Sequence, residues 1–350
     1  MTTPERITRF DALDGLRGIC ACLVYFYHRR IWQDYLNPGY QGNGLIQQLL
    51  ESGSKLGVCV FFVLSAFLFT RKVLNNEIKN PLSFVFGRFF RIAPLCWFVT
   101  LFVITYSVLD THGIGIGTTD FAKRLAIWMS GGLRDGPTPL VQPMGWWHFV
   151  AGNWWTLRHE WLLYSLVPIS AAVIGKPRNK IIYAGTTLGL LLLFKDVSGV
   201  LLHSANVSFI GGIILALAVR RPTPMWSVLL MAIASIVSIS NIFQLSGYFP
   251  YSIPATTITF LFLRHSQIQA AMTIKIVKSI GESSYSIYML HGIIIFLTIK
   301  IAKVISWIPY SITCALQFIV VIAVSRLIFL SVELLGVKLG KTVTSKLDVL

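Results

Sequence analysis

The chain has 350 residues, of which 55% are hydrophobic and only 13% are charged, and its mean hydropathy is +0.69. These values exclude an ordinary soluble domain, which needs a larger polar surface. The formal net charge of +16 comes from cations that lie between long apolar blocks. We therefore expect them to face anionic membrane lipids and phosphates, and we expect no nucleic-acid partner.

Apolar runs of about 20 residues, the length at which a helix crosses a bilayer, recur along the whole chain. They predict an all-α fold, a polytopic transmembrane helix bundle of about ten spans. We expect one integral-membrane domain over residues 1–350. The expected spans are residues 14–31, 57–75, 84–109, 154–174, 180–196, 199–219, 225–243, 248–264, 281–302 and 309–335.

The distribution of Lys and Arg predicts the orientation of the bundle. With the N-terminus in the cytoplasm, most cations between the expected spans fall on the cytoplasmic side. Both termini are then cytoplasmic, and the longest hydrophilic stretch, 110–153, is an extracytoplasmic loop. Its Trp146 and Trp147 suit stacking on a sugar ring, and they equally suit the aromatic belt at the membrane interface.

The first expected span, "LDGLRGICACLVYFYHRR", carries two groups that are costly inside a membrane. Arg17 and His28 lie about 16 Å apart along a helix, which is about three turns, so they share one face. In the predicted orientation Arg17 is near the cytoplasm and His28 near the outer surface. A lone histidine on a helix is more often structural, and a same-face arginine and histidine that link both membrane surfaces weaken that interpretation.

The third expected span begins with "FGRFFRIAP". Arg88 and Arg91 are three residues apart, so they share a helix face at the cytoplasmic start of the span. Paired arginines with aromatic neighbours suit an anionic group such as phosphate. Their spacing alone favours the simpler interpretation, a cytoplasmic anchor that follows the positive-inside rule.

The fourth expected span places Glu160 in "NWWTLRHEWLLYSLVP", where the apolar part of the span begins. A carboxylate at the outer edge of a span suits a general base, or a group that orients a histidine. An interfacial ion pair with Arg158 explains it equally well.

The ninth expected span carries a polar stripe in "ESSYSIYMLHG". Tyr285, Tyr288 and His291 are spaced by three residues and lie on one side of a helix. Such a stripe suits a buried site, and it also suits a hydrogen-bonded seam between helices.

Five stretches in this order resemble the membrane-bound acyltransferase-3 family, which includes O-antigen and exopolysaccharide O-acetylases. The opening "RFDALDGLRGICACLVYFYH" looks like the family's Arg-x10-His signature, and "RFFR" looks like its cytoplasmic Arg-x-x-Arg motif. The stretch "WTLRHEWLLYSLVP" resembles its tryptophan–hydroxyl–glutamate block, and "SYSIYMLH" resembles its late tyrosine–histidine block. The stretch "GVCVFFVLSAFLFT" resembles its second-helix motif, with Ala66 where glycine is usual.

The resemblance implies an O-acyltransferase of the bacterial cytoplasmic (inner) membrane. Such an enzyme takes an acyl group, usually acetyl, from acetyl-CoA in the cytoplasm. It delivers that group to a hydroxyl of an extracytoplasmic carbohydrate, such as O-antigen, exopolysaccharide or a lipid-linked sugar. The expected partners are therefore acyl-CoA, a carbohydrate or lipid-linked glycan acceptor and membrane lipids.

The resemblance also suggests roles for the residues named above. Arg88 and Arg91, together with Arg17, would bind the phosphates of coenzyme A. His28 would act as general base, since a neutral imidazole near pH 7 suits that role. Glu160 would orient His28 or replace it as the base.

The polar stripe has a suggested role too. Tyr285, Tyr288 and His291 would line the acyl channel or stabilise the developing oxyanion. A thioester is activated enough to react without a metal, and the chain has no Walker loop, no H-E-x-x-H and no Cys–His metal spacing. We therefore expect no metal.

The main alternative is a transporter or flippase of a sugar or a lipid-linked intermediate, which would also have many spans and buried charges. The chain shows no internal repeat of the kind common in transporters. A transporter would move its substrate unchanged. A third class, a non-catalytic binding or regulatory protein, predicts that removing His28 leaves surface chemistry unaltered.

Overall fold

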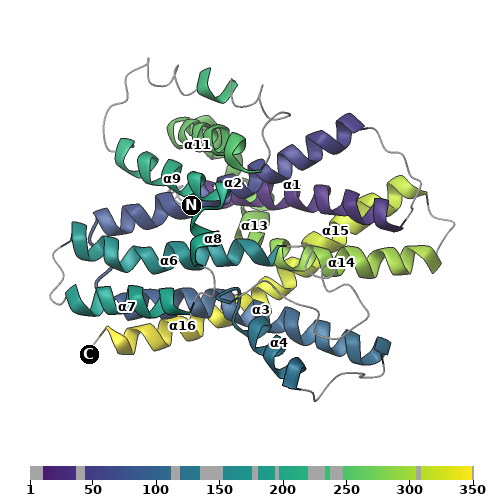
Figure 1. Cartoon of the computed structure of the whole chain (residues 1–350). Helices are drawn as coiled ribbons and strands as arrows, with labels where there is room; N and C mark the ends of the chain where they lie inside the picture. Colours follow the sequence, from purple (N-terminus) through teal and green to yellow (C-terminus); the bar gives the residue numbers. More distant parts are fainter. Residues whose placement is uncertain are drawn as a thin grey trace, which may run out of the picture. The chain divides into compact units, whose positions relative to one another are not determined.

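The computed structural model describes residues 11–36, 44–111, 119–134, 153–175, 180–193, 197–219, 233–236, 247–304 and 309–348 (Figure 1). All regular structure in these ranges is helical, so the predicted all-α class is confirmed for the described part of the chain. The elements are α1 (Asp11–Leu36), α2 (Gly44–Leu74), α3 (Pro81–Thr111), α4 (Thr119–Met129), α6 (Trp154–Ile174), α7 (Lys180–Leu192), α8 (Val197–Leu201), η1 (Ser204–Asn206), α9 (Val207–Ala218), α11 (Phe249–Arg264), α12 (Ser266–Met272), α13 (Lys275–Glu282), α14 (Ser284–Val304), α15 (Tyr310–Ile328), η2 (Phe329–Glu333) and α16 (Leu334–Leu347).

Four of the described helices are long and apolar enough to cross a membrane. They cover Gly44–Leu74, Pro81–Tyr106, Ser284–Ile301 and Ile312–Leu347, and each overlaps an expected span. These helices make the chain an integral membrane protein. The total of about ten spans and the cytoplasmic position of both termini stay predictions, and most of the expected span 225–243 lies outside the described residues.

The chain divides into two compact units, which are described separately. Unit 1 comprises Met1–Thr70 and His203–Tyr288, and unit 2 comprises Arg71–Leu202 and Met289–Leu350. The expectation of one functional domain over 1–350 stays a prediction.

In unit 1, glycines allow α1 to lie directly against α13. A Cβ added at Gly18 would stand 2.8 Å from the backbone nitrogen of Gly281, and a Cβ added at Gly281 would stand 2.0 Å from the carbonyl oxygen of Asp14. Helices in membranes associate through such small residues because backbones can then approach closely. The contact lies at the same turn of α1 as Arg17, so it fixes the backbone that carries this residue.

A second seam in unit 1 joins α9 to α2 and α11. A Cβ at Gly212 would stand 2.3 Å from the carbonyl oxygen of Val63, so these backbones touch. The hydroxyl groups of Ser208 and Ser252 hydrogen-bond at 2.8 Å between α9 and α11. Small residues and a hydroxyl pair thus bring these helices close together, beside apolar contacts such as the stacked rings of Phe62 and Phe209.

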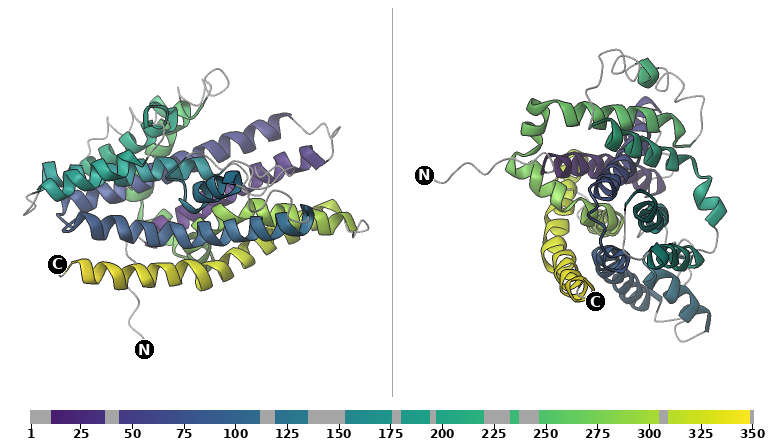
Figure 2. Two further views of the ribbon diagram at one scale, coloured as in Figure 1. Left: turned by 60° about the horizontal axis from the view of Figure 1, so that its bottom comes forward. Right: turned by 90° about the vertical axis from the view of Figure 1, so that its left-hand side faces the viewer.

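In unit 2, α16 runs beside α3 (Figure 2). Gly336 faces the bend of α3, where an added Cβ would stand 2.6 Å from both the Phe90 carbonyl oxygen and Pro94 Cγ. Pro94 lies inside α3 and has no N–H to donate to that carbonyl. At the other end of the pair, the Asn80 side chain donates a hydrogen bond of 2.8 Å to the carbonyl of Leu347.

The short helix α4 is held by indole groups. Trp97 Nε1 of α3 donates to the carbonyl of Met129, and Trp161 Nε1 of α6 donates to the carbonyl of Gly131, both at 2.9 Å. Gly131 and Gly132 have φ values of +59° and +90°, which glycine adopts without strain. This turn connects α4 to the unit, and α4, with 11 residues, is too short to span a bilayer.

We expect Gly281→Ala to lower the stability of the detergent-solubilised protein by about 1–3 kcal/mol, because the new methyl group would force α13 away from Asp14 and thus from α1. Equilibrium unfolding in mixed micelles measures this. Gly185→Ala on α7 is the matched control, since no atom lies within 4 Å of its added Cβ. Equal stability of the two variants would show that α1 and α13 are not in this contact.

Candidate active site

Arg17 and His28 lie on one uninterrupted helix, α1, as the sequence predicted. The Arg17 guanidinium pairs with the carboxylate of Asp14 at 3.4 Å, one turn earlier, and it is partly exposed. His28 is half-buried, and its imidazole lies 5.5 Å from the ring of Tyr27. Both side chains are therefore partly exposed, and they lie about three turns apart on α1.

Arg88 and Arg91 lie in the first half of α3. The Arg88 guanidinium stands over the ring of Phe84, 6.0 Å from its centroid, and this contact orients the planar group. Helix α3 contacts α6 here, through the rings of Phe84 and Tyr164. The two cations that the sequence placed on one helix face thus meet a second helix of unit 2.

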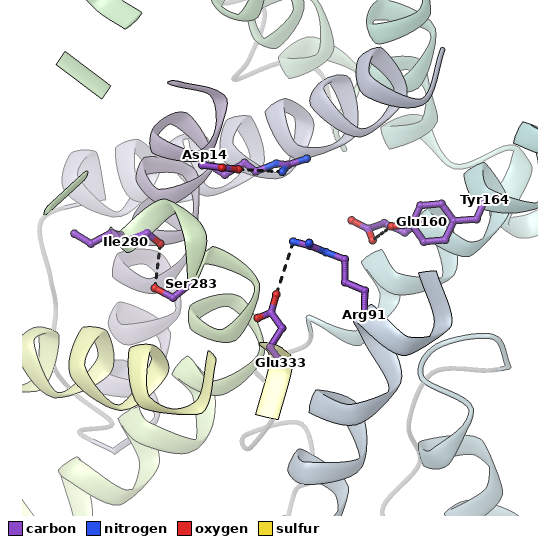
Figure 3. Close-up of polar contacts among 8 residues, drawn as sticks. Asp14, Arg91, Glu160, Tyr164, Ile280, Ser283 and Glu333 are labelled. Carbon is purple, nitrogen blue, oxygen red and sulfur yellow. Dashed lines mark hydrogen bonds and ion pairs between the residues drawn. The ribbon is translucent and has the colours of Figure 1, made fainter. Parts of the chain in front are cut away.

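That second helix contributes Glu160. The Tyr164 hydroxyl, one turn further along α6, donates a hydrogen bond of 2.7 Å to Glu160 Oε2 (Figure 3). The Tyr164 ring is buried and makes an edge contact with Phe84. Glu160, Tyr164, Phe84 and Arg88 are therefore connected through unit 2, a grouping that the spacing of the motifs in sequence does not indicate.

Arg91 has a carboxylate partner from the end of the chain. Its Nη2 lies 3.7 Å from Glu333 Oε1 of η2. The Glu333 side chain is 0% exposed, whereas that of Arg91 is 40% exposed. Figure 3 shows Arg91 with Glu333 on one side and with Glu160 and Tyr164 on the other. The guanidinium thus forms an ion pair with a buried carboxylate, at more than hydrogen-bond distance, and is still accessible.

The polar stripe lies on α14, as expected. Tyr288 is buried and its ring makes an edge contact with Phe61 at 6.0 Å. His291 is fully buried, whereas Tyr285 is half-buried. A buried imidazole and two phenol groups on one helix agree with either predicted use of the stripe, a lined site or a helix seam.

Two further expectations stay untested. Trp146 and Trp147 lie outside the described residues. Within the described ranges, no group of three or more His, Cys, Asp or Glu residues is placed to hold a metal ion. The expectation that no metal is required stays a prediction.

Sequence reasoning missed Glu333 and Tyr164. Glu333 is an isolated acid in the apolar run "IFLSVELLG", and a lone carboxylate in a span is itself a signal of function. Tyr164 follows Glu160 by four residues, the spacing at which helical side chains meet. Arg326 is a charged residue in the same apolar segment, and its guanidinium lies 5.0 Å from the centroid of the Phe329 ring.

The contact between Tyr164 and Glu160 yields a testable coupling. We expect Tyr164→Phe and Glu160→Gln to be non-additive by about 1 kcal/mol, since each change removes one partner of the same hydrogen bond. A double-mutant cycle of unfolding in mixed micelles measures this value. Additive effects would mean that the hydrogen bond contributes nothing to stability.

The geometry can be compared with known protein families. The profile of the acyltransferase-3 family, described as an acyltransferase domain, matches residues 10–328. No curated protein and no solved structure shows a significant match to the chain. The matched range includes Arg17, His28, the Arg88 and Arg91 pair, Glu160 and the stripe on α14. Because the match covers most of the chain, the protein belongs to the acyltransferase-3 family of membrane acyltransferases.

Proposed function

We propose that this chain transfers an acyl group, most simply acetyl, from acyl-CoA to a hydroxyl of an extracytoplasmic carbohydrate. O-antigen, exopolysaccharide and lipid-linked sugars are the acceptor classes. The observation that carries the proposal is the family match over residues 10–328. We place the protein in the bacterial cytoplasmic membrane with its N-terminus in the cytoplasm, where acyl-CoA is available, because the Lys and Arg distribution favours that orientation.

The donor is proposed to bind at arginines. The half-buried Arg88 and the Arg91 side chain, which is 40% exposed, present planar sets of N–H donors that match phosphate oxygens. Arg17 on α1 is a third cation assigned to this task. Coenzyme A offers a pyrophosphate and a separate phosphate, so several arginines suit it better than one.

The proposed chemistry is attack of the acceptor hydroxyl on the thioester carbonyl. The acceptor oxygen forms the new C–O bond, the C–S bond breaks, and coenzyme A leaves as a thiolate. His28 takes the hydroxyl proton as general base and returns it to the departing sulfur. No metal is required, because the thioester is already an activated acyl group.

Other residues have supporting roles in this proposal. One carboxylate oxygen of Glu160 accepts a hydrogen bond from the Tyr164 hydroxyl. We therefore assign Glu160 mainly to orienting polar groups, and the role of general base is its alternative. Tyr285, Tyr288 and His291 supply hydroxyl and imidazole groups for the oxyanion or the channel wall. Trp146 and Trp147 are assigned to the acceptor, whose sugar rings stack well on indoles.

The family match favours acyl transfer over the alternative function, transport. The two functions differ in a chemical readout, since a transporter leaves its substrate unmodified and an acyltransferase adds a group of known mass.

We expect cells that express the wild-type chain to carry O-acyl groups on their surface polysaccharide, and cells with His28→Ala at equal membrane abundance to lack them. NMR and mass spectrometry of the purified polysaccharide measure the acyl content, with an empty vector as baseline. Equal acylation by both chains would move the base to Glu160 or His291. The acyltransferase proposal fails if cells with the wild-type chain and cells with the empty vector have the same acyl content in every host. The hosts tested are ones that make O-antigen, exopolysaccharide or lipid-linked sugars.

We expect Arg88→Gln to raise the KM for acetyl-CoA about tenfold, because a charge-assisted bond to phosphate is lost. Arg124→Gln is the matched control, since Arg124 pairs with Asp120 on the surface of α4. Initial rates in isolated membranes, with acetyl-CoA varied, measure the effect. An unchanged KM for Arg88→Gln would place the donor phosphates elsewhere.

A further inference from the structure

Glu333 is a fully buried carboxylate and the single acidic residue of the long apolar helix Ile312–Leu347. Removing a carboxylate from water costs several kcal/mol, and an ion pair regains that cost only in good geometry. A pair of apolar residues would close the same contact at lower cost. The position of Glu333 opposite Arg91, at 3.7 Å, is therefore better explained by what the carboxylate does to Arg91 than by stability.

The backbone is specially adapted at this residue. Glu333 ends η2, a π-helical turn between α15 and α16. Buried Ser325 and Glu333 are eight residues apart, which in a regular α-helix leaves them about 80° apart around the axis. A π-turn accommodates one additional residue and so removes most of that offset. The turn thus brings Glu333 onto the inward face, and π-turns occur frequently at functional sites.

The neighbouring packing fixes both partners of the pair. Gly336, three residues after Glu333, lies directly against Phe90 and Pro94, which flank Arg91 on α3. Gly340 extends the same contact along Phe90. The seam between α3 and α16 is therefore closed by backbone and ring contacts, and the ion pair is not needed to hold the helices together.

We propose that Glu333 is a positioning residue for the donor site. It holds one edge of the Arg91 guanidinium at a buried carboxylate, so that the exposed edge faces the phosphate groups of acyl-CoA. A guanidinium has five N–H donors in a rigid plane, so fixing one edge fixes the direction of the other. This inference rests on the proposed function, in which acyl-CoA is the donor. Glu333 itself lies outside residues 10–328, the range that the family profile matches.

The test is the dissociation constant of coenzyme A for the full-length chain in nanodiscs, measured by isothermal titration calorimetry. We expect Glu333→Gln, which keeps the shape but removes the charge, to weaken binding about tenfold. Arg91→Gln weakens binding at least as much. In the double variant, loss of Glu333 has no additional effect, because Glu333 acts through Arg91.

Glu51→Gln is the matched control and binds like wild type, since Glu51 pairs with Lys55 on α2. If Glu333→Gln does not fold, Glu333→Asp replaces it, with the charge retained but set back by one methylene group, and weaker binding is again expected. Loss of both variants from the membrane would make the pair purely structural and overturn the inference.

The outcomes separate the two proposals. Coenzyme A binding by wild type with an unchanged constant for Glu333→Gln overturns the positioning role and leaves the proposed function intact. An equal weakening with and without Arg91 also overturns it, since Glu333 would then act by another route. Absence of binding by wild type overturns the proposed donor and the inference together.

Discussion

A polar side chain on an apolar helix must find its partner inside the protein, because lipid offers none. Many hydroxyl groups of this chain meet the requirement locally, as when Thr100 and Thr259 donate to carbonyls one turn earlier. Others meet it between helices, as Ser208 and Ser252 do. Charged groups have a higher desolvation cost, and the buried carboxylate of Glu333 pairs with an arginine on another helix. The residues with the highest desolvation cost are therefore those whose position says most about function.

The same constraint explains why glycine determines the packing. Helices in lipid gain little from burying large apolar side chains, so they gain from close backbone approach. Gly281 brings α13 to the turn of α1 that carries Arg17, and Gly336 brings α16 to the turn of α3 that carries Arg91. In each unit a glycine contact thus lies within about one turn of an arginine assigned to the donor. Under the proposed function, helix packing and donor binding therefore depend on the same positions, and a change that separates the helices will also displace the cation.

The sequence predicted the helical class, the continuous helix that carries Arg17 and His28, and the position of Arg88, Arg91 and Glu160 on later helices. Local periodicity determines all of these. Local periodicity does not determine which helices meet, so the pairing of Arg91 with Glu333 was not predictable. The π-turn that places Glu333 inward has no recognisable residue pattern either. The hydrogen bond between Tyr164 and Glu160 could have been predicted from the sequence, because it follows from helical spacing alone. The number of spans and the role of Trp146 and Trp147 depend in part on residues outside the described ranges.

The surroundings of Arg91 bear on how a donor site in a membrane protein stays selective. Anionic lipid headgroups are abundant at the cytoplasmic surface and compete for any exposed arginine. A carboxylate that already pairs with Arg91 lowers its attraction for a single phosphate, whereas a ligand with several phosphates can engage Arg88 and Arg91 together and still gain. The carboxylate also limits the directions that the guanidinium can take, so the ordering cost is met before the ligand arrives. On this argument, if Arg91 binds the donor as proposed, its buried acid partner disfavours ligands with a single phosphate and favours a ligand that engages both arginines.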